Sequence, residues 1–240
     1  MKKKTYKEKN TIIMTALLIA AICAIFAGTT YAFLSASTTN NPVTNTFIAA
    51  GGGNIVDPDI PTGETSNFYL NESLASLNQT KDGYTLDTTQ KVTTNNYEGV
   101  VPGITISKDP ALTLDISTDV YAYVYVEIVD GTKPSGSSTS NITYQVTSDW
   151  NLLSGITGAN GGAIYLYNNA AVLGVDGKEL DAKQILANNR VSVSNNLVDV
   201  DPTTSGIQLG TLKLYAYVTQ SAGFSDAASA YTASFPSNNG

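Results

Sequence analysis

Histidine is absent from all 240 residues of the chain. Its absence excludes the Ser-His-Asp and Cys-His arrangements of nucleophilic enzymes, the His-Glu-x-x-His zinc helix and ordinary structural zinc sites. Paired carboxylates can catalyse without histidine, but the acidic residues here are scattered and nothing marks two of them as partners. We therefore predict a protein that is not an enzyme, with no catalytic residues, no cofactor-binding residues and no metal ligands.

Three small groups of acidic residues are the best candidates for metal ligands in the sequence. None of them follows the Asp-x-Asp-x-Asp-Gly loop with a closing glutamate that binds calcium. Aspartate is common in turns and caps, so turn acidity is the preferred interpretation and calcium binding stays open. The groups are Asp57 with Asp59, Asp176 with Glu179 and Asp181, and Asp199 with Asp201.

Cysteine and positive charge are also scarce. The single cysteine is Cys23, and 13 basic residues face 20 acidic ones. If residues 1–32 are removed, five lysines and one glutamate leave with them, so 8 basic and 19 acidic residues remain, a net charge of −11. Such a chain has no disulfide, although 208 residues suffice for a sizeable core. Its acidity also argues against a nucleic-acid partner, because nucleic-acid binding relies on Lys and Arg at the phosphates.

Residues 1–32 have the layout of a secretory signal peptide. A basic head with five lysines is followed by an apolar run over residues 12–26 and a small-residue exit. That run is shorter than the ~20 residues of a membrane-spanning helix. We predict cleavage between Ala32 and Phe33, or secondly after Ala36, and export to the cell surface or extracellular matrix. An uncleaved membrane anchor is the alternative.

An extended arm precedes the main body of the predicted mature chain. Residues 33–53 combine a β-prone segment with three consecutive glycines, and residues 54–66 form a turn-rich linker with two prolines. The arm could add a strand to an exposed sheet edge through main-chain hydrogen bonds. We expect the body to span residues 67–240. The side chains predicted to seat in a neighbouring subunit are Phe33, Val43, Phe47 and Ile48.

The sequence pattern of the body predicts an antiparallel β-sandwich. Three segments alternate aliphatic residues with tyrosines, a period of two that places the aliphatic set in the core and the tyrosines on a half-wet face. Those faces could stack on sugar rings, although tyrosine is also simply favoured in strands. Two short helices are expected, at residues 182–187 behind Asp181 and at 226–231 behind Ser225. The alternating segments are residues 120–129, 163–167 and 212–219, and further strands are expected at 111–116, 142–147, 190–194 and 207–209.

Five motifs follow one another along the chain. They are Gly28-Thr29-Thr30-Tyr31-Ala32-Phe33, Asn45-Thr46-Phe47, residues 101–110 leading into Ala122-Tyr123-Val124-Tyr125-Val126, Trp150 with Tyr165-Leu166-Tyr167-Asn168, and residues 215–224 followed by 227–231. The first resembles a SipW-type signal-peptide exit, and the last resembles a closing strand and short helix. As an ordered set they resemble the TasA/camelysin family of secreted Gram-positive biofilm-matrix proteins.

The resemblance implies a jelly-roll β-sandwich that is exported, trimmed by a dedicated signal peptidase and assembled into matrix fibres. Fibres of that family form by donor-strand exchange, in which the freed N-terminal segment of one subunit completes a sheet of the next. The implied partners are copies of the same chain and the signal peptidase, with an accessory matrix or anchor protein as a further candidate.

Two other functions stay open. One is a monomeric surface adhesin or binding module, although residues 235–240 contain neither a sorting motif nor an apolar segment. The other is a camelysin-like metallopeptidase, which the absence of histidine and of a zinc motif disfavours.

Overall fold

The computed structural model describes residues 36–37, 43–49, 68–77, 83–115, 121–132, 140–173, 178–197, 201–203 and 206–236. These residues belong to one compact unit, Ala36–Gly240. The predicted cleavage site at Ala32 and Phe33 lies outside the described residues, as do the glycine hinge and the linker.

The described residues form an all-β fold with one short helix, α2, at Ala227–Ser234. None of their helices is long and apolar enough to cross a membrane. The strands are β1 (Ala36–Ser37), β2 (Val43–Ala49), β3 (Phe68–Leu77), β4 (Tyr84–Val92), β5 (Thr94–Val100), β6 (Thr105–Ser107), β7 (Ala111–Asp115), β8 (Tyr121–Asp130), β9 (Ile142–Val146), β10 (Trp150–Thr157), β11 (Ala163–Tyr167), β12 (Val172–Leu173), β13 (Lys178–Gln184), β14 (Leu186–Val193), β15 (Asp201–Thr203) and β16 (Gly206–Gln220).

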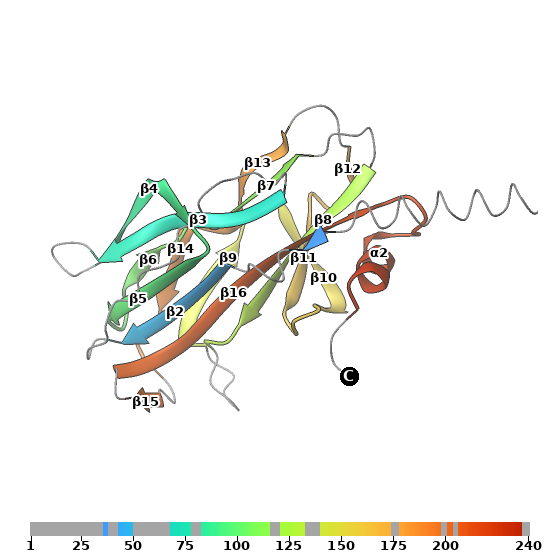
Figure 1. Ribbon diagram of the computed structural model, residues 1–240. Coiled ribbons are helices and arrows are strands. Elements are labelled where there is room, and N and C mark those ends of the chain that lie inside the picture. The colour runs from blue at the N-terminus through green and yellow to red at the C-terminus, as the bar shows by residue number, and fades with distance from the viewer. Residues whose placement is uncertain are drawn as a thin grey trace, which may run out of the picture. The chain divides into compact units, whose positions relative to one another are not determined.

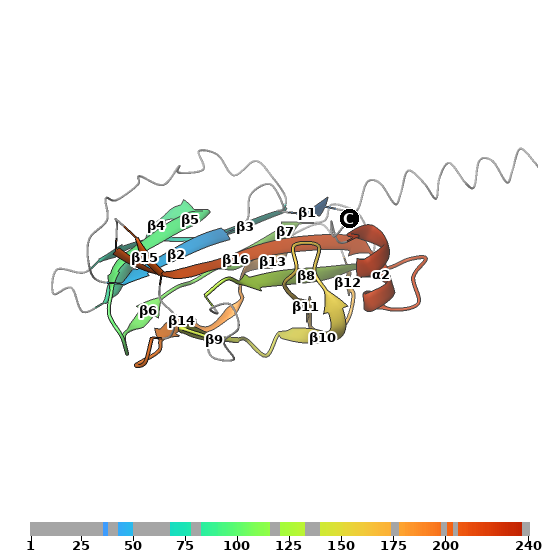
Figure 2. The same cartoon turned by 90° about the horizontal axis from the view of Figure 1, so that it is seen from below.

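The strands form three sheets, and every described pair except β2–β5 is antiparallel. The large sheet has the order β10-β11-β8-β16-β2-β5, with β1 and β15 paired to β16 and β12 paired to β8. The second sheet is β13-β7-β3-β4 and the third is β6-β14-β9. In Figure 2 the third sheet lies on the side of β16 away from β3 and β4. The predicted all-β, antiparallel sandwich is confirmed, and its jelly-roll connectivity stays a prediction.

The alternating pattern of β8 and β16 builds the centre of the large sheet. The two strands pair in continuous register from Leu212↔Asp130 to Gln220↔Ala122. Val124, Val126 and Ile128 on β8 are buried against the aliphatic residues of β16. Burying one such side chain stabilises the fold by about 1.5–3 kcal/mol, so this pair of strands holds much of the core.

The tyrosine face of these strands is more buried than predicted. Tyr125 and Tyr217 are 0% and 1% exposed because α2 covers them, whereas Tyr121 at the start of β8 is 57% exposed. The hydroxyl of Tyr125 donates to the carbonyl of Ala227, and the ring of Tyr231 on α2 packs edge-on against both tyrosines. The part of this face that α2 covers is therefore a second core layer.

The third alternating strand, β11, faces the opposite way. Register places Ile164 beside Glu127 and Leu166 beside Tyr125, so the aliphatic residues of β11 lie on the tyrosine face of β8. They join the same buried cluster. A one-residue shift in register turns every side chain of a strand over, and such a shift is invisible in a local pattern.

The predicted C-terminal helix is confirmed as α2. Its N-cap is Asp226 instead of Ser225: the Asp226 carboxylate accepts from the Ser229 amide at 2.8 Å, and the Ser229 hydroxyl bonds back to the Asp226 amide at 3.3 Å. This reciprocal pair is a capping box.

The predicted helix at residues 182–187 is wrong. These residues end β13 and begin β14, which pair with β7 and β9. Ala182 has a φ of +46°, its amide donates to the hydroxyl of Thr113 at 3.1 Å, and Ile185 and Leu186 are fully buried. Pairing to two sheets therefore overrides a good local helix propensity.

Several strands were not predicted. The longest are β3, β4 and β5, which together span Phe68 to Val100, and β10 beside β11; β13 and the short strands β12 and β15 were not predicted either. Their sequences are rich in Asn, Thr, Ser and Glu, so they lack the clear aliphatic alternation that marks β8 and β16.

Candidate assembly site

The arm strand β2 lies inside the large sheet, between β16 and β5 (Figure 1). It pairs antiparallel with β16, from Val43↔Leu214 to Ile48↔Gln208, and parallel with β5, from Thr44↔Thr94 to Ala49↔Val100. Both edges of β2 are therefore hydrogen-bonded, and we call the place that it occupies the β16–β5 slot.

The short strand β1 extends this pairing along β16. Ala36 lies opposite Val218 and Ser37 opposite Tyr217. Two stretches of the arm, Ala36–Ser37 and residues 43–48, therefore pair with β16 between Val218 and Gln208. Such pairing provides main-chain hydrogen bonds, the interaction that strand addition depends on.

A bulge marks the end of β16 that pairs with Ile48. Gly210 has a φ of +102°, and the register with β2 shifts between Gln208 and Gly210. A Cβ at Gly210 would lie 2.2 Å from the carbonyl oxygen of Gly131. Only glycine fits this position. The glycine at position 210 of β16 is therefore what allows the bulge at this end of the slot.

The other wall of the slot, β5, is tied to the second sheet by Asn95. The side-chain oxygen of Asn95 accepts from the Ala75 amide at 2.8 Å. Its side-chain nitrogen donates to Glu72 at 2.7 Å and to the Ser73 carbonyl at 2.9 Å. Asn95 is 1% exposed and lies opposite Asn45 of β2. Three hydrogen bonds to β3 thus hold β5 at the position where it meets the arm.

A fully buried ion pair lies directly behind Asn95. The Lys108 ammonium is 2.6 Å from Glu72, and both side chains are 0% exposed. Burial raises the pKa of Glu72 and lowers the pKa of Lys108, and in each case the partner's charge opposes that shift. The pair is satisfied on the Glu72 side because each carboxylate oxygen accepts one hydrogen bond, from Asn95 and from Lys108.

Asp109, the next residue along the chain, extends the network. Its carboxylate accepts from the amide of Ser73 at 2.8 Å and from the hydroxyl of Ser73 at 2.6 Å, and Lys91 donates to the same hydroxyl at 3.1 Å. The residues of this network come from β3, β4, β5 and the segment after β6, so it joins the wall of the slot to the second sheet. We refer to Glu72, Ser73, Lys91, Asn95, Lys108 and Asp109 as the anchor network.

Aromatic side chains complete the anchoring of β5. Tyr97 is fully buried and packs edge-on against Tyr84 of β4, with ring centroids 5.0 Å apart. The Tyr84 hydroxyl donates to the carbonyl of Glu98 on β5. Burial raises the pKa of Tyr84 to about 12 and lifts the pKa of Tyr97 well above its ordinary value of 10.

These raised values predict alkaline destabilisation. The unfolded chain ionises tyrosine near pH 10, whereas Tyr84 stays protonated in the fold until about pH 12. The folded state therefore binds more protons in this window, and its stability is full below pH 10 and is lost as the pH rises through 12. Urea unfolding at increasing pH should show a falling free energy of unfolding above pH 10. The fall should be smaller in Tyr84→Phe and unchanged in Tyr121→Phe, since Tyr121 is 57% exposed; equal curves for the two variants would contradict the assignment.

A second buried carboxylate stabilises the other end of the large sheet. Glu127 accepts from the amides of Asn160 and Gly162, at 2.9 and 2.8 Å, and from the hydroxyl of Tyr217. The Tyr231 hydroxyl accepts from the amide of Ala159 at 3.0 Å. These bonds fix the turn between β10 and β11 to the core and to α2, so we assign this cluster a structural role.

Three of the predicted assembly residues, Val43, Phe47 and Ile48, belong to β2, and the structure places their backbones in the slot. Phe33 lies outside the described residues. The anchor network was not predicted, because Glu72, Asn95 and Lys108 come from segments without a strand pattern and only folding brings them together. Within the described residues, no group of three or more His, Cys, Asp or Glu side chains is placed to hold a metal ion.

Comparisons with protein-family models, with curated proteins and with solved structures give no match to this chain.

Proposed function

We propose that this chain is a secreted structural protein that assembles into extracellular matrix fibres by exchanging β2 between subunits. The observation that carries the proposal is the position of β2, which lies inside a sheet and is paired on both edges. In the exchanged form, β2 of one subunit occupies the β16–β5 slot of the next. Because every subunit donates one strand and accepts one, the contact is head-to-tail and continues as a filament.

The chain between β2 and β3 is long enough for exchange. Eighteen residues separate Ala49 from Phe68, and a fully extended segment of that length spans at most about 60 Å. Residues 51–53 are three consecutive glycines, which tolerate almost any backbone conformation. The arm can therefore reach a neighbour while β3 and the anchor network keep their places.

Exchange conserves the main-chain hydrogen bonds of the slot. The same strand in the same register forms the same bonds within one chain or between two, so the bonds themselves favour neither state. The balance is then set by new contacts between bodies and by the entropy of association. Exchange therefore depends on concentration and on access to the arm.

Signal-peptide removal is the proposed trigger. In the precursor, residues 1–32 would hold the arm at the membrane, and cleavage between Ala32 and Phe33 frees it. The proposed partners are other copies of this chain, the signal peptidase during export, and an accessory matrix or anchor protein. The proposal includes no catalytic role and no nucleic-acid partner.

Electron microscopy of two purified chains tests this function. The chain that starts at Phe33 is expected to form fibres, whereas a chain that starts at Asn54 has no arm to donate and should form none. Circular dichroism checks that the shorter chain is folded. Fibres from both chains would rule out the arm as the joint, and monomers from both would favour a monomeric adhesin or binding module.

A mixture of the two chains sharpens this test. The shorter chain keeps the slot but cannot donate, so it is expected to cap growing filaments. Small amounts added to the chain that starts at Phe33 should shorten its fibres. Fibres of unchanged length would contradict the proposal that the empty β16–β5 slot accepts the arm of another subunit.

A further inference from the structure

A cavity of about 310 Å³ opens between β9 and β14 of the third sheet. Paired positions stop at Leu186↔Val146 and resume at Val191↔Tyr144, so four residues of β14 lie opposite Gln145 alone. This is a special β-bulge with more than one extra residue, and β-bulges often re-aim side chains beside binding sites.

The bulge is fixed in an unusual backbone conformation. Asn188 and Asn189 have φ values of +57° and +51°, in the left-handed region. The Asn189 carbonyl accepts from the Lys108 amide at 2.7 Å, and Arg190 pairs with Ser107 of β6. Hydrogen bonds to β6 and to Lys108, which follows it, hold the bulge on the side away from β9. The bulge is therefore a fixed wall of the cavity.

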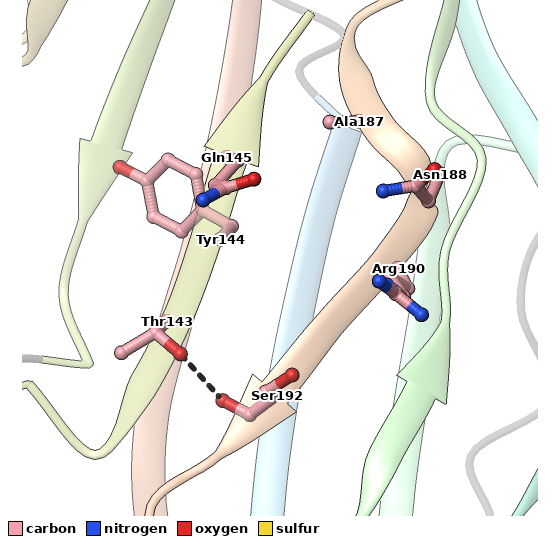
Figure 3. Close-up of a pocket in the computed structure, with 7 residues that line it drawn as sticks. All are labelled: Thr143, Tyr144, Gln145, Ala187, Asn188, Arg190 and Ser192. Carbon is pink, nitrogen blue, oxygen red and sulfur yellow. Dashed lines mark hydrogen bonds between the residues drawn. The ribbon is translucent and has the colours of Figure 1, made fainter.

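Hydrogen-bonding side chains line both walls. Figure 3 shows Gln145 on the β9 side of the gap and Asn188 and Arg190 on the β14 side, with Thr143 bonded to Ser192 at one end. Gln145, Asn188 and Arg190 are exposed and have no side-chain partner within the described part of the chain. Together they present guanidinium and amide donors with two amide acceptors, a set suited to a ligand with several polar groups.

Arg190 is the only arginine in the chain. In the described residues, Lys108 and Lys183 are paired with carboxylates, whereas the guanidinium of Arg190 is not. A planar guanidinium binds a carboxylate through two parallel hydrogen bonds, which a lysine cannot do. A single positive group on a strongly acidic protein matches a singly charged carboxylate better than a doubly charged phosphate.

We propose that this cavity binds a sugar ring that carries a carboxylate, a uronate. Arg190 holds the carboxylate, while Asn188 and Gln145 bind ring hydroxyls through their amides. The cavity volume is at the low end of ligand sites and suits one ring, either a free monosaccharide or one unit of an acidic polysaccharide. This inference does not depend on strand exchange.

Titration of the chain that starts at Phe33, followed by NMR or calorimetry, tests the site. Sodium glucuronate supplies both features, glucose has the hydroxyls without the charge, and acetate has the charge without the ring. Glucuronate is expected to bind at least about tenfold more tightly than either of the others, since it satisfies both halves of the site. Acetate binding as tightly as glucuronate, or no glucuronate binding at millimolar concentration, would overturn the proposal. A polyuronate compared with glucuronate then separates a polymer from a free sugar as the source.

Three variants locate the binding. Arg190→Gln should weaken glucuronate binding by about tenfold or more, because the charge-assisted pair is lost. Asn188→Gly keeps the left-handed backbone and removes the amide, so a smaller loss of severalfold is expected. Lys183→Gln makes the same charge change outside the cavity and should leave affinity unchanged. Binding that survives Arg190→Gln would overturn the assignment, and fibre formation by this variant keeps the test separate from assembly.

Discussion

A cysteine pair placed across the slot is expected to control assembly by redox state. The variant Thr44→Cys with Lys213→Cys joins positions that lie opposite each other on β2 and β16. Opposed residues of antiparallel strands have Cα atoms about 4.5 or 5.5 Å apart, within the range that a disulfide bridges. Cys23 lies in the predicted signal peptide, so the introduced thiols are the only ones in the chain that starts at Phe33.

The order of oxidation and assembly decides the result. Oxidation of dilute monomer locks β2 in its own slot, so no fibres should form until a reductant is added. Oxidation of preformed fibres instead joins β2 of each chain to β16 of the next. Denaturing gel electrophoresis without reductant should then show a ladder of covalent multimers.

Single-cysteine variants are the matched control. Thr44→Cys alone or Lys213→Cys alone can give no product larger than a covalent dimer, and neither should block fibre formation. If the oxidised pair variant forms fibres as readily as the reduced one, then β2 does not leave its slot and strand exchange is wrong.

Loss of the buried cation in the anchor network is expected to have the largest effect on stability. Lys108→Met leaves the Glu72 carboxylate buried without its partner, which costs about 3–5 kcal/mol of the free energy of unfolding. Urea denaturation at neutral pH measures this loss. The loss should shrink as the pH falls, because Glu72 has a raised pKa and can become neutral by binding a proton.

Two further variants distinguish buried charge from charge in general. Lys183 pairs with Asp149 at 2.7 Å, but their side chains are 34% and 39% exposed, so Lys183→Met should cost less than about 1 kcal/mol. The double variant Glu72→Met with Lys108→Met removes both charges and should recover much of the lost stability. Equal losses for Lys108→Met and Lys183→Met would contradict a central role for the buried pair.

The anchor network connects stability to the proposed function. Among the described strands, β5 pairs only with β2, so the large sheet cannot hold β5 when the arm leaves. Asn95 and the edge-on contact of Tyr84 with Tyr97 tie β5 to the second sheet instead. We expect variants of the network to weaken strand acceptance as well as the fold.

Local pattern and chain pairing account for different parts of this structure. The alternation in residues 120–129 and 212–219 is a property of neighbouring residues, and β8 and β16 form where it predicts. The capping pattern before Ala227 is equally local, and it predicts the first residue of α2 to within one position. The helix expected at residues 182–187 fails because its residues pair with β7 and β9, which lie far away in the sequence.

The sequence by itself determined the all-β class, the strands with a strong period of two, the short C-terminal helix and the β-prone nature of the arm. Only the tertiary structure decided that β2 lies between β16 and β5, that Tyr125 and Tyr217 are buried, and that Glu72 meets Lys108. The reason is physical. Strand propensity and capping depend on residues a few positions apart, whereas register, burial and ion pairing depend on segments that the chain brings together only when it folds.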